Sequence, residues 1–437
     1  MSLESRLLTA LAPWRHVPAW RVGFSGGLDS SVLLHLLARL AQRETLPAIS
    51  AIHVHHGLQA AADAWPAHCQ AFCQALGIPL LIERVAVEPG ASLEQAARCA
   101  RYAAFERNLA VGDCLLTAQH CDDQAETLLF RLLRGAGVRG LAGMPQSRPL
   151  GRGLLLRPLL AFSRDELEHY ARQEGLLWVE DPSNVDTGFA RNYLRQRVMP
   201  LLVERWPQAA ASLARSAAHL AEAETLLAEL AELDLQAAAT PAGHAWLPLP
   251  SLAVEPLARL SESRQRNLLR HWLAPYTRMP DSAHWAGWQA LRDASGDAAP
   301  VWRLGDGEVH RSAGRLWWLA GPWLQAAQGE LIWSEPRQPL SLPGNGRLSL
   351  CGEPPVGPLR VAYRQGGEQL LLAGRGRRDL KRLLNEAALP TFARARLPLL
   401  LRADELLGVA NLQGFRRGGE GGWSLHWEPP TNDSGLS

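Results

Sequence analysis

Cysteine is scarce in this 437-residue sequence, and its spacing argues against several kinds of site. The six cysteines, at positions 69, 73, 99, 114, 121 and 351, form no C-x-x-C pair. Disulfides, a zinc site and a C-x-x-C-held iron–sulfur cluster are therefore not expected. Lysine is scarcer still, because Lys381 is the single lysine among 45 basic residues.

Long apolar runs are missing as well. No stretch of about twenty apolar residues occurs, so the sequence predicts no membrane-spanning helix. The N-terminus also lacks the basic-then-apolar pattern of a secretory signal. We therefore expect a cytoplasmic protein without a membrane partner.

The chain has no strong overall charge, but its basic residues are unevenly distributed. The net charge is +2. Residues 127–164 hold seven arginines and no acid, and residues 360–417 hold twelve basic and five acidic side chains. Such patches suit a polyanion, and two solvated faces are the competing interpretation.

A glycine- and serine-rich turn lies near the N-terminus. Residues 25–30, Ser-Gly-Gly-Leu-Asp-Ser, connect the apolar strand-like segment 21–24 to the apolar helical segment 31–37. Glycine lets the backbone approach a ligand closely, and the N–H groups of a first helical turn attract an anion. The turn lacks the lysine of a Walker A loop and the spacing of a dinucleotide-binding loop. The pattern predicts a phosphate-binding loop, with an ordinary helix-capping turn as the weaker interpretation.

Strands and helices alternate through the first 175 residues. Apolar runs at 48–54, 80–87, 114–118 and 153–157 predict further strands, and helical spacing is found at 63–76, 92–109, 123–134 and 164–175. This alternation predicts a parallel sheet covered on both faces. Ligands bind such sheets beyond the carboxyl ends of the strands, where residues 25–30, 53–57 and 120–123 are expected to lie.

Two polar motifs follow the second and fourth of these strands. The first, His-Val-His-His-Gly at 53–57, suits a nucleotide base or ribose better than a metal. The second, residues 120–127, places Asp123 and Glu126 three apart on one side of a helix. Paired acids beside a triphosphate commonly hold Mg²⁺, and helix capping by acids is the alternative.

Beyond residue 175 the pattern changes. Residues 192–237 are rich in alanine and leucine and predict a long helical segment with breaks near Pro200 and Pro207. Helices are expected at 255–273 and 281–293, followed by a hairpin around residues 305–307. Residues 326–358, rich in proline and glycine, are expected to connect to a mixed α/β unit.

Residues 25–30 resemble the PP-loop of the ATP pyrophosphatases, which cleave ATP between its α and β phosphates. Motifs along nearly the whole chain resemble one family, bacterial tRNA(Ile)-lysidine synthetase. Besides residues 25–30, the matching residues are 53–58, Glu94, Arg98, Arg101, Tyr102, 117–127, 134–137, 157–159, 178–184, 191–195, Leu380, Lys381, Arg394 and 398–400. Phe392 departs from the tryptophan usual in the family but keeps an aromatic ring.

The resemblance implies an α/β fold: a parallel-sheet PP-loop domain of the adenine nucleotide α hydrolase-like type, a mainly helical middle domain and a small α+β C-terminal domain. The expected segments are a PP-loop domain at 1–215, a helical linker at 216–250, a middle domain at 251–325, a connecting segment at 326–358 and a C-terminal tRNA-binding domain at 359–430.

The resemblance also implies a two-step reaction. ATP adenylates the C2 oxygen of the wobble cytidine in a tRNA(Ile) with a CAU anticodon, and the ε-amino group of free L-lysine then displaces AMP to give lysidine. Another PP-loop tRNA-modifying enzyme, such as a thiolase, and a non-catalytic tRNA-binding protein are the alternatives. A homodimer is left open.

The candidate site residues follow from these motifs and the resemblance. The predicted catalytic residues are Asp29, Asp123 and Glu126, and the predicted Mg²⁺ ligands are Asp29 and Glu126. The predicted ATP-binding residues are Ser25, Gly26, Gly27, Leu28, Asp29, Ser30, His53 and His56. The predicted tRNA-binding residues are Arg191, Asn192, Arg195, Arg377, Arg378, Lys381, Arg382 and Arg394.

Overall fold

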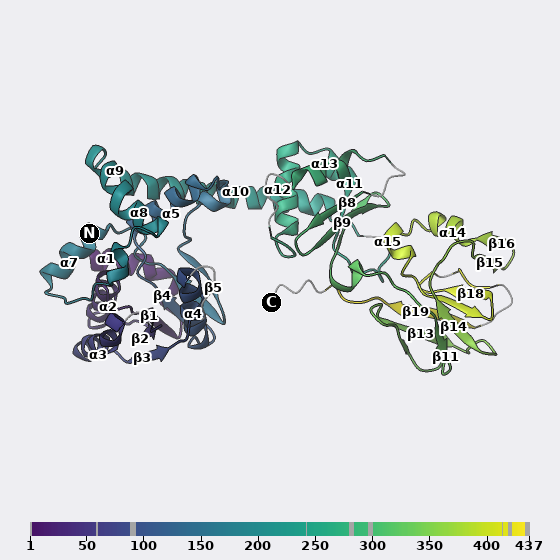
Figure 1. The fold of residues 1–437 in the computed structure, drawn as a ribbon, viewed down its shortest axis with the longest axis horizontal. Helices are drawn as coiled ribbons and strands as arrows, with labels where there is room; N and C mark the ends of the chain where they lie inside the picture. Colours follow the sequence, from purple (N-terminus) through teal and green to yellow (C-terminus); the bar gives the residue numbers. More distant parts are fainter. Residues whose placement is uncertain are drawn as a thin grey trace. The chain divides into compact units, whose positions relative to one another are not determined.

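The chain forms two compact units in a computed structural model. They comprise Met1–Leu226 and Leu227–Ser437, and each is described by itself (Figure 1). The structure describes residues 2–57, 60–87, 93–241, 243–278, 284–295, 300–412, 414–417 and 422–432. No helix in these ranges combines the length and the apolar character that crossing a membrane requires.

A six-stranded sheet forms the centre of the first unit. In spatial order its strands are β3 (Leu80–Arg84), β2 (Ala48–His55), β1 (Ala19–Gly23), β4 (Cys114–Leu116), β6 (Gly153–Leu156) and β5 (Ser147–Leu150). The predicted parallel sheet is confirmed, since only β5, at the edge, runs antiparallel to its neighbour. The sequence does not predict β5, because its four residues include Pro149, which cannot donate to a ladder.

The strand order places the ligand-binding edge of this sheet. From β1 the chain builds outward to β2 and β3 on one side, and β4 and β6 lie on the other side. The order therefore reverses between β1 and β4. In open α/β sheets this reversal point leaves a crevice beyond the strand ends, so the loops after β1 and β4 flank a natural binding site.

Helices cover both faces of the sheet. Alternate strand residues face different cores, with Leu116 in one and Leu115 in the other, as the two-residue period of a strand requires. The first core also receives apolar side chains of α1 (Leu3–Leu11), α2 (Leu28–Ala41), α3 (Trp65–Leu76) and α7 (Arg164–Gln173). The second core receives Phe105 of α4 (Leu93–Arg107).

Five further helical segments of the first unit precede the long helix that ends it. They are α5 (Cys121–Leu133), α6 (Val138–Leu141), α8 (Ala190–Tyr193), a π-helical turn at Leu194–Val198 and α9 (Met199–Arg205). The long helix α10 (Ala209–Ala238) then carries the chain into the second unit. The predicted breaks are confirmed, because Pro200 lies in the first turn of α9 and α10 begins after Pro207.

The second unit begins with a helical layer and an antiparallel sheet. Its helices are α11 (Val254–Ala258), α12 (Glu262–Leu273) and α13 (Trp285–Asp293), and the sheet order is β7 (Ser251–Ala253), β10 (Arg315–Leu319), β9 (Gly307–Ser312) and β8 (Val301–Leu304). The predicted hairpin is the β8–β9 pair, joined at Gly305 and Asp306. Tryptophans 272, 285, 288, 302 and 318 dominate the core between the layers.

The remainder of the second unit contains three small sheets. Their strands are, in spatial order, β11 (Leu331–Trp333), β14 (Leu359–Ala362), β17 (Leu399–Arg402) and β18 (Glu405–Val409); β12 (Leu340–Ser341), β13 (Arg347–Gly352) and β19 (Trp423–Glu428); and β15 (Gln369–Leu372) and β16 (Gly376–Asp379). Two helices complete the unit, α14 (Leu380–Glu386) and α15 (Thr391–Arg394). Because β11 pairs with β14 and β13 with β19, residues 326–358 contribute strands to sheets that the C-terminal residues complete. The domain boundaries expected from the sequence stay a prediction.

Candidate active site

The glycine-rich turn forms a preorganised loop between β1 and α2. Gly26 has a φ of +82°, and a Cβ there would lie 3.0 Å from Cys69 Sγ and 3.1 Å from Val179 Cγ2. The Ser30 hydroxyl donates to the Gly27 carbonyl at 3.0 Å and lies 3.0 Å from Ser25 Oγ. No side chain caps α2 at Gly27, so the first-turn N–H groups are available to an anion.

Asp29 places an unpaired carboxylate oxygen in this loop. Its Oδ1 atom is buried and has no hydrogen-bond partner in the part of the chain that the structure describes, and its Oδ2 atom lies 3.7 Å from His120 Nε2. Burial raises the pKa of Asp29 above its ordinary value, although His120 and Arg164 act in the opposite direction. A buried acid of this kind is satisfied by a cation or a proton, so its free oxygen fits a Mg²⁺ ligand.

His120 lies among three carboxylates at the start of α5. Its side chain is 1% exposed, and its ring nitrogens lie 3.5 Å from Asp123, 3.6 Å from Asp122 and 3.7 Å from Asp29. Burial alone would lower the pKa of His120, but these carboxylates raise it overall. Neither ring nitrogen makes a hydrogen bond of ordinary length to a described residue.

Two arginines from the segment after α7 clamp the acids of α5. Arg195 contacts Glu126 Oε1 at 2.6 Å and Asp123 Oδ1 at 2.7 Å. Arg191 contacts Glu126 Oε2 at 3.2 Å and Asp123 Oδ1 at 3.4 Å. Burial acts to raise the pKa of Asp123, but His120 and the two arginines hold it below its ordinary value. The clamp joins α5 to α8 and to the π-helical turn. Turns of π-helix are often found at functional sites.

The clamp changes how four predicted residues are interpreted. Glu126 is almost fully buried with both oxygens paired to arginine, so it offers no free oxygen to a metal. Arg191 and Arg195 face acids of their own chain rather than a free phosphate. Asn192 donates to the carbonyls of Ser183 and Asp186, each at 2.9 Å, and so holds the neighbouring loop. The geometry therefore favours positioning roles for these four residues.

The histidines after β2 face the same space as the loop. His53 Nδ1 lies 2.9 Å from the Phe24 carbonyl, which can only accept, so Nδ1 carries the proton. Its buried Nε2 has no hydrogen-bond partner among the described residues and is left as an acceptor. Burial lowers the pKa of both His53 and His56, which keeps the rings neutral. The described residues contain no group of three His, Cys, Asp or Glu that could hold a metal.

One cavity of about 500 Å³ collects most of these groups, a volume typical of small-molecule sites. Its lining includes Ser25, Gly27, Leu28, Asp29, Ser30, His53, His56, Arg101, Tyr102, Asp123, Arg164, Trp178, Val179 and Arg195. The Val179 N–H donates to the Gly26 carbonyl at 2.9 Å, so the 178–181 loop closes over the phosphate-binding loop. Leu58 and the side chains of Glu94 and Asn184 lie outside the described part of the chain.

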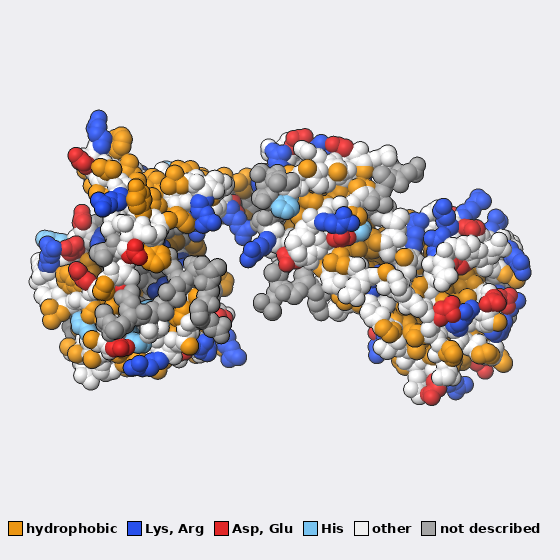
Figure 2. All heavy atoms as spheres, in the orientation of Figure 1, with side chains coloured by type: hydrophobic (Ala, Val, Ile, Leu, Met, Phe, Trp, Pro, Cys, Tyr) orange, Lys and Arg blue, Asp and Glu red, His pale blue; other side chains and the backbone are white. Residues whose placement is uncertain are grey.

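The C-terminal basic residues lie on one surface of the second unit. Figure 2 shows Lys and Arg side chains gathered over α14 and the β15–β16 hairpin. Arg377, Arg378, Lys381 and Arg382 are exposed there, and Arg382 lies 3.5 Å from Glu386. Arg394 is different, because its Nε donates to the Leu389 carbonyl at 2.8 Å and its Nη1 donates to Asn385.

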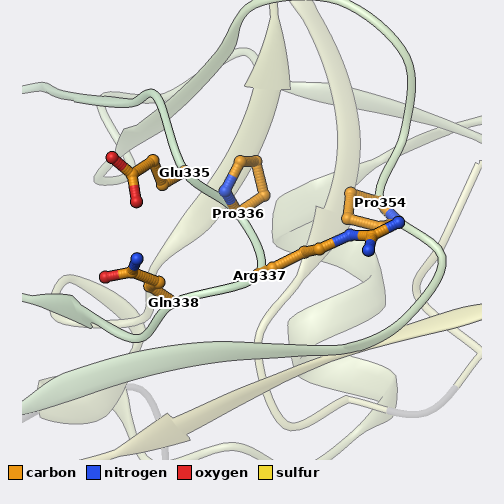
Figure 3. A pocket seen from close by; sticks show the side chains of 5 residues that line it. All are labelled: Glu335, Pro336, Arg337, Gln338 and Pro354. Carbon is orange, nitrogen blue, oxygen red and sulfur yellow. The ribbon is translucent and has the colours of Figure 1, made fainter.

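The second unit also has a small hollow of about 410 Å³, lined by Glu335, Pro336, Arg337, Gln338 and Pro354 (Figure 3). The Arg337 side chain extends toward Pro354, whereas Glu335 and Gln338 point to the other side of their loop. One cation beside two prolines provides no set of groups for catalysis.

Comparisons with known proteins agree with this geometry. Family models match a PP-loop domain at residues 1–202, a TilS substrate binding domain at 252–317 and a TilS substrate C-terminal domain at 359–427. A tRNA(Ile)-lysidine synthase from Pseudomonas aeruginosa is 67% identical over 100% of this chain and 99% of its own length. Those of Pseudomonas fluorescens and Pseudomonas syringae are 62% and 63% identical over 100% of this chain and 99% and 98% of theirs.

Proposed function

This chain belongs to the tRNA(Ile)-lysidine synthase family, and we propose that it ligates free L-lysine to C2 of the wobble cytidine in a tRNA(Ile) with a CAU anticodon. ATP is consumed, and lysidine, AMP and pyrophosphate are formed. The observation that carries the proposal is the cavity that Ser25, residues 27–30 and Asp123 line together. Matches to both TilS substrate domains favour this activity over a thiolase.

In the adenylation step the loop binds the triphosphate. The free N–H groups of the first turn of α2 and the Ser25 and Ser30 hydroxyls donate to phosphate oxygens. Against the effect of burial, the pKa of His120 is raised by its three neighbouring carboxylates, so protonation of His120 would add positive charge beside the phosphate oxygens. Asp29 would hold a Mg²⁺ ion that neutralises phosphate charge. His53 Nε2 and His56 are proposed to contact the nucleoside of ATP.

In the transfer step the lysine amine must be neutral to attack C2. Asp123 and Glu126 are both ion-paired with Arg191 and Arg195. Against the effect of burial, His120 and the two arginines hold the pKa of Asp123 below its ordinary value, which makes Asp123 a poor proton acceptor in this arrangement. We propose that these two acids and the arginines fix the geometry of α5, and that Asp29 is the acid that touches the reacting groups.

The tRNA is proposed to bind the exposed surface of Arg377, Arg378, Lys381 and Arg382 through its phosphates. Arg394 contributes less, because its Nε donates to the Leu389 carbonyl and its Nη1 donates to Asn385. ATP and tRNA as substrates are consistent with a cytoplasmic location. The homodimer stays a prediction.

The test is a reaction of the purified protein with ATP, L-lysine and a tRNA(Ile) transcript bearing CAU. Nucleoside mass spectrometry should show lysidine in place of one cytidine, and omission of lysine should leave an adenylated tRNA. An initiator tRNA(Met) transcript, which has the same anticodon, is the matched control and should remain unmodified. Incorporation of sulfur, or no lysine-dependent product, would overturn the proposal.

A further inference from the structure

One arginine on the wall of the active-site cavity has a side chain that no described residue pairs with. Three arginines line this cavity, Arg101, Arg164 and Arg195. Arg195 is paired with Glu126 and Asp123, and Arg101 interacts with other residues of the chain. The half-buried side chain of Arg164 makes no hydrogen bond or ion pair with any residue that the structure describes. Arg164 therefore offers its guanidinium to a ligand of the cavity.

The backbone of Arg164 is fixed where α5 and α7 begin. Its N–H donates to Asp122 Oδ2 at 2.9 Å, which joins the first residue of α7 to the first turn of α5. Ser163 and Glu166 form a capping box, so the start of α7 is stabilised without the Arg164 side chain. A side chain carried on an anchored backbone loses less freedom when it binds a ligand. The chain thus holds Arg164 in place for a contact outside the described residues.

The position of Arg164 relates it to the phosphate-binding loop. Arg164 lines the cavity together with Asp29, the acid of that loop. Burial acts to raise the pKa of Asp29, and the positive charge of Arg164 is one of those that oppose this rise. The guanidinium therefore lies close enough to the loop to act on a triphosphate that the loop binds. In the sequence, Arg164 is the last of the seven arginines of residues 127–164, a basic run that the tRNA-binding surface proposed above does not include.

We propose that Arg164 is a catalytic residue of the adenylation step, in which it donates hydrogen bonds to a phosphate oxygen on which negative charge develops. The proposal rests on the function proposed above. In this step the C2 oxygen of the cytidine attacks the α-phosphorus of ATP, and the bond from this phosphorus to the α,β-bridging oxygen breaks. The electron pair of that bond leaves with pyrophosphate. A guanidinium suits this task, because it stays protonated and can donate two parallel hydrogen bonds to a phosphate.

Two phosphate groups could supply the oxygen that Arg164 contacts. One is the pyrophosphate, which takes the electron pair of the broken bond. The other is the α-phosphoryl group, which carries extra charge while both oxygens are partly bonded to it. The two groups share their chemistry but differ in the second step, because only the α-phosphoryl group is still present when lysine displaces AMP.

The first test follows single-turnover pyrophosphate release from ATP with a tRNA(Ile) transcript bearing CAU and no lysine. Arg164→Gln should slow this release roughly 100-fold or more, as the loss of one preorganised oxyanion donor does. The ATP concentration that gives half the maximal rate should change less than about tenfold, because the contact strengthens as charge develops. Arg164→Lys, which keeps the charge but loses the paired donors, should give an intermediate rate. Arg172→Gln, a substitution of an exposed arginine on the same helix, is the matched control and should leave the rate unchanged.

A second measurement identifies the phosphate. Adenylated tRNA, prepared with the wild type in the absence of lysine, is mixed with each variant and L-lysine, and the release of AMP is timed. If Arg164→Gln releases AMP at the wild-type rate, Arg164 acts on the leaving pyrophosphate. If AMP release is slowed by a similar factor, Arg164 acts on the α-phosphoryl group.

Other outcomes contradict the proposal. Adenylation by Arg164→Gln within about threefold of the wild-type rate would overturn it, and so would a defect confined to tRNA affinity or to the KM for lysine. The melting temperature should not change, because the Arg164 side chain makes no contact that its replacement would break among the described residues. If the wild type releases no pyrophosphate with this tRNA, the proposed function fails instead.

Discussion

The pKa values of two aspartates that line one cavity are shifted in opposite directions, because their neighbours differ. Asp123 has His120, Arg191 and Arg195 around it, and its pKa is lowered. Asp29 has one oxygen without a hydrogen-bond partner among the described residues, and its pKa is raised by burial. Environments that separate the pKa values of like groups commonly assign them different roles. This contrast supports the proposal that Asp29, and not Asp123, is the acid that takes part in ligand chemistry.

Asp29→Asn should abolish tRNA-dependent pyrophosphate release while the fold remains intact. The amide keeps the shape of the side chain but cannot bind Mg²⁺ as an anion or take up a proton. Steady-state rates should fall by at least 100-fold, and near-normal lysidine formation would show that Asp29 has no chemical role.

The same variant should become relatively more stable as pH rises. Because the pKa of Asp29 is raised in the folded state, its protonated form contributes stability at low pH that is lost once the pH exceeds about 4 and passes through the folded pKa. The asparagine side chain has no such loss. Melting temperatures of both proteins between pH 4 and 7 should therefore diverge in favour of the variant. A constant difference would argue against a buried, unpaired Asp29.

At the scale of elements, the phosphate-binding loop depends on Gly26. Its positive φ disfavours any L side chain, and a Cβ would also crowd Cys69 and Val179. Gly26→Ala should lower ATP affinity at least tenfold, measured by calorimetry. Gly77→Ala is the matched control, because its φ is also positive at +68° but nothing lies within 4 Å of its Cβ. It should cost about 1 kcal/mol of stability without changing ATP binding.

The clamp between α5 and α8 predicts a larger structural role for Glu126 than its position near the start of a helix suggests. As a helix-capping acid, Glu126 would contribute only about 0.3–1 kcal/mol to the free energy of unfolding. Glu126→Gln instead leaves Arg191 and Arg195 without their main partner in a nearly buried contact. We expect a loss of about 2–4 kcal/mol, less than for a fully buried pair because both arginines are partly exposed. Urea unfolding should show this loss. The control is Glu168→Gln, which should cost under about 0.5 kcal/mol, because Glu168 is a half-buried acid of α7 whose partner Arg172 is exposed.

The elements show how far the sequence determines the site. Apolar runs and turn residues predicted β1, β2, β4 and the loops that follow them, because these signals are local. The pairing of Glu126 with Arg195, 69 residues later, was not predictable from spacing, since only the folded chain brings α5 to the π-helical turn. His120 was read as part of a motif and not as a site residue. The three acids around it, including Asp29 from another loop, become evident only in three dimensions.

At the scale of the whole molecule, residues 355–437 cannot be separated from the rest of the second unit, because the two share a hydrophobic core. Trp427 lies in β19 at 2% exposure, where its indole donates to the Asn345 carbonyl at 2.7 Å. The same core contains Trp317 of β10. Arg396, part of the basic excess in the sequence, is 3% exposed and donates to backbone carbonyls. Deleting residues 355–437 would expose this core, so charge substitutions are the sounder test of tRNA binding.

Combined substitution of Arg377, Arg378 and Lys381 by Gln should weaken tRNA binding and flatten its salt dependence. These side chains are exposed on β16 and α14, so their loss removes phosphate contacts without opening the core. Each lost contact should reduce the slope of log affinity against log salt by about 0.7–0.9. The matched control replaces Arg259, Arg303 and Arg347, exposed arginines of the same unit that pair with Glu255, Glu308 and Glu428. Filter binding over a salt series should show an unchanged slope for the control. If both triple variants have the slope of the wild type, the surface of α14 and β16 is solvated and the tRNA binds elsewhere.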